Sequence, residues 1–296
     1  MKKYLPWLDR HARFQPLKAV VFAACLAPGA LHAYWWAAGE LGGRAVNELI
    51  HGSGLWAMRF LVISLAVTPL NRSLDWSRLL TVRRMLGVTA GAYAIIHFLL
   101  YVVEQKFAPV VVITEIIKRF YLTIGFVALV GLVALTATST DKSVRKLGRA
   151  WKRLHWLVYP IGGLALWHYA LQSKANVSDA VFLSGLFTWL ILWRALPDGW
   201  RRPIVTYPAL AACATVLTAG IEASWYGLVS GVDPWRVLAA NQSIEFGFRP
   251  AHWVLITTVG ITAIIAVRRW MTPRTGRAIN AGRSSGPIRA GTANGS

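Results

Sequence analysis

The sequence predicts an all-α, polytopic bundle of transmembrane helices, and both composition and residue order support this fold class. Of 296 residues, 55% are hydrophobic and only 15% are charged, and the mean hydropathy is +0.46. The apolar residues form long blocks, and Lys and Arg stand in short clusters at the block ends. This composition excludes an ordinary soluble enzyme. The placement of the charge, +20 in total, is typical of loops at a membrane surface rather than of a nucleic-acid groove.

Eight apolar blocks are each close to the roughly 20 residues that a helix needs to cross a bilayer. We expect spans at residues 18–38, 54–70, 83–104, 120–137, 154–171, 181–195, 205–225 and 252–269. The second and sixth blocks are short, and the seventh carries Glu222 near its end. These three spans therefore have the least support from the sequence.

The charges on the connections predict how the spans are oriented. Basic residues dominate the N-terminal arm (1–17), the second, fourth and sixth connections and the C-terminal tail (271–296), whereas the odd-numbered connections are less basic or mixed. Basic connections remain on the cytoplasmic side, so we expect both termini there. The first block has the length and flanks of a span and lacks a clean cleavage site, which argues against a cleavable signal. The tail is rich in Gly, Ser, Arg and Pro, which predicts disorder.

The two cysteines limit the redox chemistry that the sequence predicts. Cys25 and Cys213 both lie in apolar blocks and form no CxxC or CxxCH pair. A disulfide framework, an iron–sulfur cluster and a covalently attached haem are therefore not expected.

Two histidines inside apolar blocks are the principal candidate site residues. His97 follows Arg83 by 14 residues and His168 follows Arg153 by 15, so at about 1.5 Å per residue each rises roughly 21 to 22 Å from the cytoplasmic boundary. An ionisable side chain at that depth costs about 3 kcal/mol on insertion scales, which indicates function. Neutral imidazoles level with each other on parallel helices can bind a haem iron from both sides. Histidines that bridge helices by hydrogen bonds would produce the same pattern.

His155 lies in a different position from the other two histidines. It stands two residues after Arg153, at the cytoplasmic interface, and precedes His168 by 13 residues, which is about 20 Å of helical rise. The position level with it on the third span is Arg84 or Met85, so a second haem between two histidines lacks an evident partner.

Two segments resemble a known family. The sequences RRMLGVTAGAYAIIHFLLY and LTATSTDKSVRKLGRAWKRLHWLVYPIGGLALWHY resemble the MsrQ (YedZ) family of haem-binding membrane subunits, within the ferric-reductase-like transmembrane superfamily. The resemblance covers about residues 55–196. It implies that His97, His155 and His168 match the three haem-associated histidines of the family. Two-haem members of the superfamily carry a further histidine where this chain has Arg83, which favours one haem b over two.

The resemblance also implies a six-helix core followed by two additional C-terminal helices. The expected domains are a cytoplasmic arm (1–17), a haem-binding core (18–196), two further transmembrane helices (197–270) and the tail (271–296). The implied location is the bacterial inner membrane. Neither the sequence nor the resemblance indicates a function for residues 197–270.

The activity that the resemblance implies is electron transfer. MsrQ-like subunits pass electrons across the membrane to MsrP, a soluble periplasmic partner whose molybdenum cofactor reduces methionine sulfoxide in oxidised proteins. The chain has no molybdopterin motif and no dinucleotide fingerprint, so we expect an electron-transfer subunit and not the sulfoxide-reducing catalyst. The electron donor is either a quinol or a flavin-linked reductase. A quinol donor would imply a quinone site, and a flavin-linked donor would imply FMN binding. Four basic residues could neutralise haem propionates or a flavin phosphate, or else only anchor the cytoplasmic loops: Arg83, Arg84, Lys152 and Arg153.

Two other functional classes stay open. One is a ferric or other metal reductase or oxidase, which would need a separate flavin reductase because the tail is too short for a flavin and nicotinamide domain. The other is a non-redox transporter with histidine proton relays, although such relays more often include intramembrane Asp or Glu. A visible spectrum of the purified protein distinguishes redox from non-redox classes.

Overall fold

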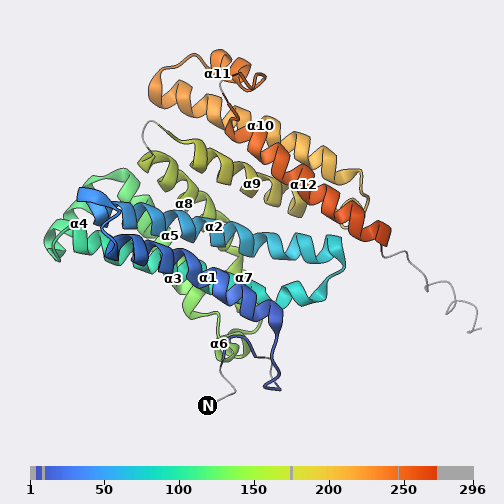
Figure 1. The fold of residues 1–296 in the computed structure, drawn as a ribbon, viewed down its shortest axis with the longest axis horizontal. Coiled ribbons are helices and arrows are strands. Elements are labelled where there is room, and N and C mark those ends of the chain that lie inside the picture. Colours follow the sequence, from blue (N-terminus) through green and yellow to red (C-terminus); the bar gives the residue numbers. More distant parts are fainter. Residues whose placement is uncertain (1–4, 9–10, 174–175, 246, 272–296) are drawn as a thin grey trace, which may run out of the picture.

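The computed structural model describes residues 5–8, 11–173, 176–245 and 247–271, and its regular elements are helices (Figure 1). They are α1 (Pro16–Ala37), α2 (Ala45–Leu74), α3 (Leu80–Glu104), α4 (Pro109–Lys118), α5 (Phe120–Ala137), α6 (Asp141–Leu147), α7 (Arg149–Trp156), α8 (Val158–Gln172), α9 (Ser178–Ala195), α10 (Thr206–Ser230), α11 (Pro234–Ala240) and α12 (Pro250–Met271). Short 3-10 turns, Gly42–Arg44 and Ser77–Leu79, precede α2 and α3. Most of the predicted N-terminal arm is described, but the predicted tail lies outside the described residues after Met271.

Each predicted span coincides with helix, which confirms the polytopic all-α class. Five helical segments in the described residues are long and apolar enough to cross a membrane: Pro16–Ala37, Gly42–Leu74, Ser77–Glu104, Phe120–Ala137 and Pro250–Met271. The predicted spans at 154–171, 181–195 and 205–225 correspond to helices α7 with α8, α9 and α10, which do not meet that criterion.

The second and fifth predicted spans differ most from the structure, and the seventh extends five residues further, to Ser230. The second begins at Ala45 instead of residue 54, because the polar residues of its first turns lower the hydropathy without preventing a helix. It ends where Asp75 adopts a left-handed conformation with φ 48°. The fifth span is divided at Leu157 into α7 and α8. Pro160 lies in the first turn of α8, where its missing N–H is tolerated but the preceding helix cannot continue regularly.

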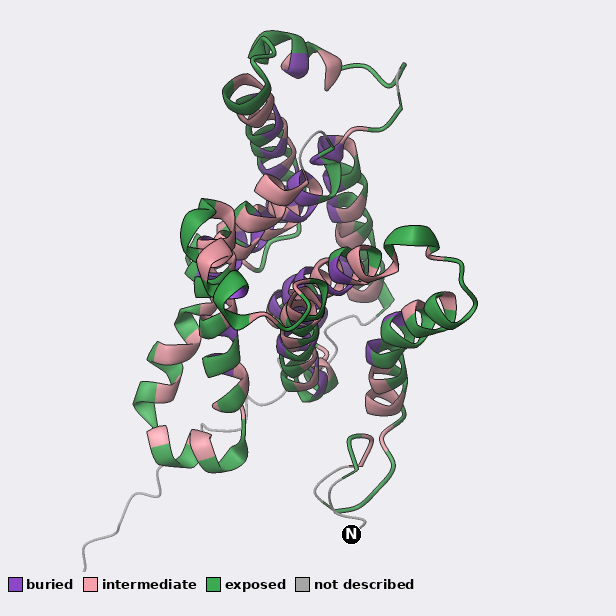
Figure 2. Cartoon of the chain, turned by 90° about the vertical axis from the view of Figure 1, so that its left-hand side faces the viewer, coloured by how far each residue is buried: buried purple, intermediate pink, exposed green. Residues whose placement is uncertain are grey.

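Helix α2 is the centre of the bundle. It packs mainly against α3 and also contacts α1, α8, α9 and α12. Half of the residues in its most apolar 18-residue stretch are buried. Helices α9, α10 and α12 pack on one another and form the layer at the top of Figure 1. Figure 2 shows buried residues where helices meet and exposed residues along their outward faces. Outward apolar side chains such as Val216 (70% exposed) fit a lipid environment.

Tyr93 joins α3 to α1 by entering the backbone hydrogen bonds of α1. Its hydroxyl donates to the carbonyl of Cys25 at 3.0 Å and accepts from the N–H of Gly29 at 2.8 Å. In a regular helix these two backbone groups would bond to each other. Pro28, buried one residue before Gly29, already removes a neighbouring N–H donor. The tyrosine therefore satisfies a local defect in α1 and fixes that helix on the bundle.

An ion pair with a buried carboxylate fastens α10 to the segment before α12. Glu222 of α10 is 3% exposed and accepts from Arg249 Nη2 at 2.8 Å. The Asn241 side chain, just after α11, donates to the same carboxylate at 2.8 Å. His252 completes the cluster, with Nε2 3.0 Å from the Asn241 carbonyl oxygen. A carboxylate that weakened the sequence prediction of a span is thus paired and hydrogen-bonded inside the protein.

Candidate haem site

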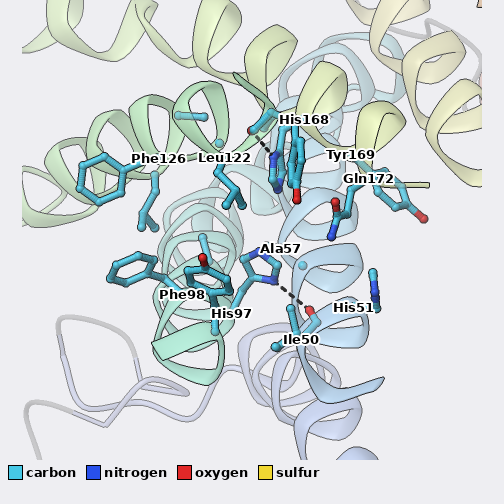
Figure 3. A pocket seen from close by; sticks show the side chains of 18 of the residues that line it. Ile50, His51, Ala57, His97, Phe98, Leu122, Phe126, His168, Tyr169 and Gln172 are labelled. Atoms are coloured by element: carbon cyan, nitrogen blue, oxygen red, sulfur yellow. Dashed lines mark hydrogen bonds between the residues drawn. The ribbon is translucent and has the colours of Figure 1, made fainter. Parts of the chain in front are cut away.

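A cavity of about 460 Å³ lies between α2, α3, α5 and α8, with α4 at its mouth. Its walls are largely apolar and include Met58, Leu61, Leu129 and Ile161. His97 of α3 and His168 of α8 both line it (Figure 3). The structure therefore brings together the two histidines that the depth argument paired.

Each imidazole is oriented by a backbone carbonyl on a neighbouring helix. His97 Nδ1 lies 2.8 Å from the Ile50 carbonyl oxygen of α2, and His168 Nδ1 lies 2.8 Å from the Tyr121 carbonyl oxygen of α5. A carbonyl accepts only, so both histidines donate from Nδ1 and keep the Nε2 lone pair free for a metal. Figure 3 shows these bonds leading away from each other, on the far sides of the two rings. Metal-binding histidines are typically held this way.

The separation of the rings fits a haem iron between them. The ring centroids of His97 and His168 are 6.2 Å apart, and the ring planes meet at 79°. Two imidazole–metal bonds of about 2.1 Å, with about 1.1 Å from each nitrogen to its ring centroid, require roughly 6.4 Å. The observed centroid spacing leaves room for one metal atom between the two imidazoles, and the apolar cavity walls suit a porphyrin. The described residues contain no cluster of three or more His, Cys, Asp or Glu that could bind a bare metal ion.

Two glycines give the imidazoles room against the helix backbones. A Cβ on Gly54 would lie 2.9 Å from His97 Nδ1, and one on Gly125 would lie 2.6 Å from His168 Nδ1. Each glycine stands four residues after the carbonyl that its histidine contacts, where a side chain would cover that carbonyl. Sequence analysis did not single out either glycine.

The two halves of the site are an internal repeat. The two hydrogen-bonded pairs have the same sequence separation of 47 residues. The shift from Ile50 to Tyr121 and from His97 to His168 is 71 residues in both cases. The same shift relates further identical residues: Gly54 and Gly125, Ala57 and Ala128, Gly91 and Gly162, Ala94 and Ala165. Comparing the chain with itself at this shift would have revealed both glycines from the sequence.

His155 lies apart from the cavity, on α7. Its Nδ1 is 3.1 Å from the Trp151 carbonyl oxygen, its Nε2 is 3.3 Å from Ser139 Oγ, and its ring stacks on Trp151 at 3.9 Å. The 71-residue shift relates His155 to Arg84, which forms an ion pair with Asp141 at 2.5 Å. At this pair of equivalent positions, only the second half of the repeat has a histidine.

The four basic residues considered for anionic groups are not among those that line the cavity. Arg83 and Arg84 are exposed on the first turns of α3, and Lys152 and Arg153 are exposed on α7. Exposed basic residues at helix ends are typical of anchors at a membrane surface.

The mouth of the cavity carries polar residues that sequence analysis did not assign to the site. Glu115, Arg119 and Tyr101 line it near α4. On the other side, a second cavity of about 630 Å³ shares Tyr169 and Gln172 with it. The only signal in the sequence was the mixed charge of the third connection, because α4 is too short to be recognised as a span.

Comparisons with known proteins show which sequences this chain is similar to. The family model described as ferric reductase like transmembrane component matches residues 53–166. A protein-methionine-sulfoxide reductase heme-binding subunit MsrQ from Xanthomonas oryzae is 40% identical over 192 residues, which cover 62% of this chain and 86% of the relative. The MsrQ protein of Brucella anthropi is 39% identical over 198 residues, covering 66% of this chain and 89% of the relative. No solved structure matches the chain.

Proposed function

We propose that this chain, which belongs to the MsrQ family of haem-binding subunits, transfers electrons across the bacterial inner membrane to a periplasmic, molybdenum-dependent methionine sulfoxide reductase of the MsrP type. The electrons come from a donor, either a quinol or a flavin-linked reductase. The partner reduces oxidised methionines in periplasmic proteins, and this chain is the electron-transfer subunit.

The observation that carries the proposal is the pair of imidazoles 6.2 Å apart, each fixed by a backbone carbonyl. A haem b held by His97 and His168 would supply a centre that accepts and releases one electron. The Nδ1–H groups of His97 and His168 orient the two rings, and the largely apolar walls would contact the porphyrin. A site without room for a substrate on the metal suits electron transfer to a separate catalyst.

The direction of transfer follows from where the cavity lies along the bundle. It is lined by residues from the beginning of α2 and the end of α3, close to α4. The basic helices α6 and α7 are in the connection that we assign to the cytoplasm. We therefore place the haem near the periplasmic surface, within reach of a soluble partner, and both termini in the cytoplasm.

The histidine assignment is tested by haem quantification in purified variants. We expect a b-type spectrum for the native chain and loss of most of it in His97→Ala and in His168→Ala, since either change removes an axial ligand. His155→Ala should retain the haem, because this residue lies outside the cavity. Two haems per chain, with one lost in His155→Ala, would contradict the single-haem proposal. A native protein without haem would leave the non-redox transporter as the explanation.

The acceptor is tested by stopped-flow reoxidation of the reduced protein. We expect rapid oxidation by the methionine sulfoxide reductase from the same cell and slow oxidation by ferric chelates. The match to the ferric-reductase-like family makes metal reduction the second candidate function. Rapid oxidation by chelate, with no response to the reductase, would favour it.

A further inference from the structure

The cavity between His97 and His168 has a single cationic side chain among the residues that line it, Arg119. Arg119 separates α4 from α5, with an extended backbone conformation (φ −105°, ψ 105°). The other charged groups at the mouth are the carboxylates of Glu104 and Glu115. A haem carries two propionates of the same sign as these carboxylates. Arg119 is therefore the one cationic group among the lining residues that could form a charge-assisted hydrogen bond with a propionate.

The Arg119 guanidinium is already oriented by neighbours. Its Nε forms an ion pair with Glu115 one helical turn earlier, and its Nη1 donates to the Tyr121 hydroxyl at 3.2 Å. These two bonds leave Nη2 for another acceptor. The planar fork of arginine matches a carboxylate better than a lysine ammonium does.

Tyr101 supplies an independent indication of an acceptor at the same place. Its hydroxyl is buried and has no hydrogen-bond partner among the described residues, and Tyr101 lines the cavity. Its electrostatic neighbours are Glu115, Arg119 and Tyr121. A buried hydroxyl without a partner costs free energy, and a carboxylate oxygen would accept a hydrogen bond from it.

We infer that Arg119 and Tyr101 form a carboxylate site that binds a haem propionate, with Glu115 positioning the guanidinium. The inference rests on the proposed function, because it needs a haem between His97 and His168. It also links cofactor binding to the axial ligand, since Tyr121 accepts from Arg119 through its hydroxyl and from His168 through its carbonyl oxygen.

The test compares protohaem with its dimethyl ester, in which both propionates are blocked. Full-length apoprotein is reconstituted with each, and the release rate of each to apomyoglobin is measured. We expect native protein to retain protohaem about 10-fold to 100-fold longer than the ester, as for a charge-assisted hydrogen bond. Arg119→Gln should remove most of this difference and leave the smaller part that depends on Tyr101. Arg119→Lys should give an intermediate ratio, and Tyr101→Phe a smaller reduction than Arg119→Gln.

Arg44→Gln is the matched control, because Arg44 is an exposed arginine that lines only the second cavity. It should leave the ratio unchanged. The inference is overturned if Arg119→Gln keeps the native ratio, or if Arg44→Gln lowers it equally. A native protein that binds neither compound would instead overturn the proposed function itself, so the two failures are distinguishable.

Discussion

Replacing Gly125 by Ala should weaken haem binding although it adds only one methyl group and changes no ligand. The new Cβ would lie 2.6 Å from Nδ1, 2.7 Å from Cε1 and 2.9 Å from Cγ of His168. Ordinary contacts of this kind begin near 3.4 Å, so the ring must move by about 0.8 Å. Such a shift from the Tyr121 carbonyl, now 2.8 Å from Nδ1, breaks the hydrogen bond that orients the ring.

The expected magnitude follows from that lost bond. Outer partners of metal-binding histidines are typically worth about 10-fold to 100-fold in metal affinity. We therefore expect haem release from Gly125→Ala to be faster by at least about 10-fold, with an altered electron paramagnetic resonance spectrum because the imidazole is rotated. Gly54→Ala should act in the same direction but less strongly, because its closest approach to His97 is 2.9 Å.

Gly163→Ala is the matched control for this prediction. Gly163 lies on α8 with His168, and a Cβ there would meet nothing within 4 Å. It reproduces the gain of helix propensity, about 1 kcal/mol, without touching a ring. If Gly125→Ala and Gly163→Ala retain haem equally and give the same spectrum, the clearance role of Gly125 is wrong.

Three further predictions concern packing away from the cavity, each measured by thermal unfolding in detergent with the visible spectrum as a check on the haem site. Tyr93→Phe leaves the Cys25 carbonyl and Gly29 N–H without their partner and should destabilise the protein by about 1–3 kcal/mol; an unchanged midpoint would mean that α1 restores its own hydrogen bond. Glu222→Ala removes the buried carboxylate that binds the partly exposed Arg249 and the Asn241 amide and should cost about 1–3 kcal/mol with the spectrum unchanged, whereas loss of haem would show that the C-terminal layer supports the site. Gly185→Val places a side chain where a Cβ already meets Thr218 Oγ1 at 2.2 Å, so we expect a loss of about 1–3 kcal/mol from overpacking, and a stability equal to native would refute the close packing of α9 on α10.

The sequence was most informative where physical constraints act along one helix. Hydropathy located the spans because lipid requires long apolar segments, and counting residues from the basic boundaries paired His97 with His168. The limits of the second span were wrong because helix formation does not require apolar residues, so polar turns extended α2 beyond the apolar block.

Features that depend on contacts between helices could not be predicted in the same way. Gly54 and Gly125 resemble other small residues in membrane helices until the ring opposite each one is known. The role of the Ile50 and Tyr121 carbonyls does not depend on the side chains of these residues, so the sequence does not reveal it. Arg119 has the same pattern in the sequence as any basic residue in a connection between spans. The 71-residue repeat is an exception, because it was present in the sequence and required only a comparison of the chain with itself.

In the proposed site, the repeat would make haem a cross-link between two helical hairpins. His97 belongs to the hairpin of α2 and α3, and His168 to that of α5 and α8, so neither hairpin alone could bind the iron from both sides. A cofactor that binds only the assembled pair stabilises it by mass action, by about 4.1 kcal/mol at a free concentration 1,000 times the dissociation constant. Haem supply during biogenesis would therefore control how much of this chain persists as an assembled bundle, apart from any control of electron flow.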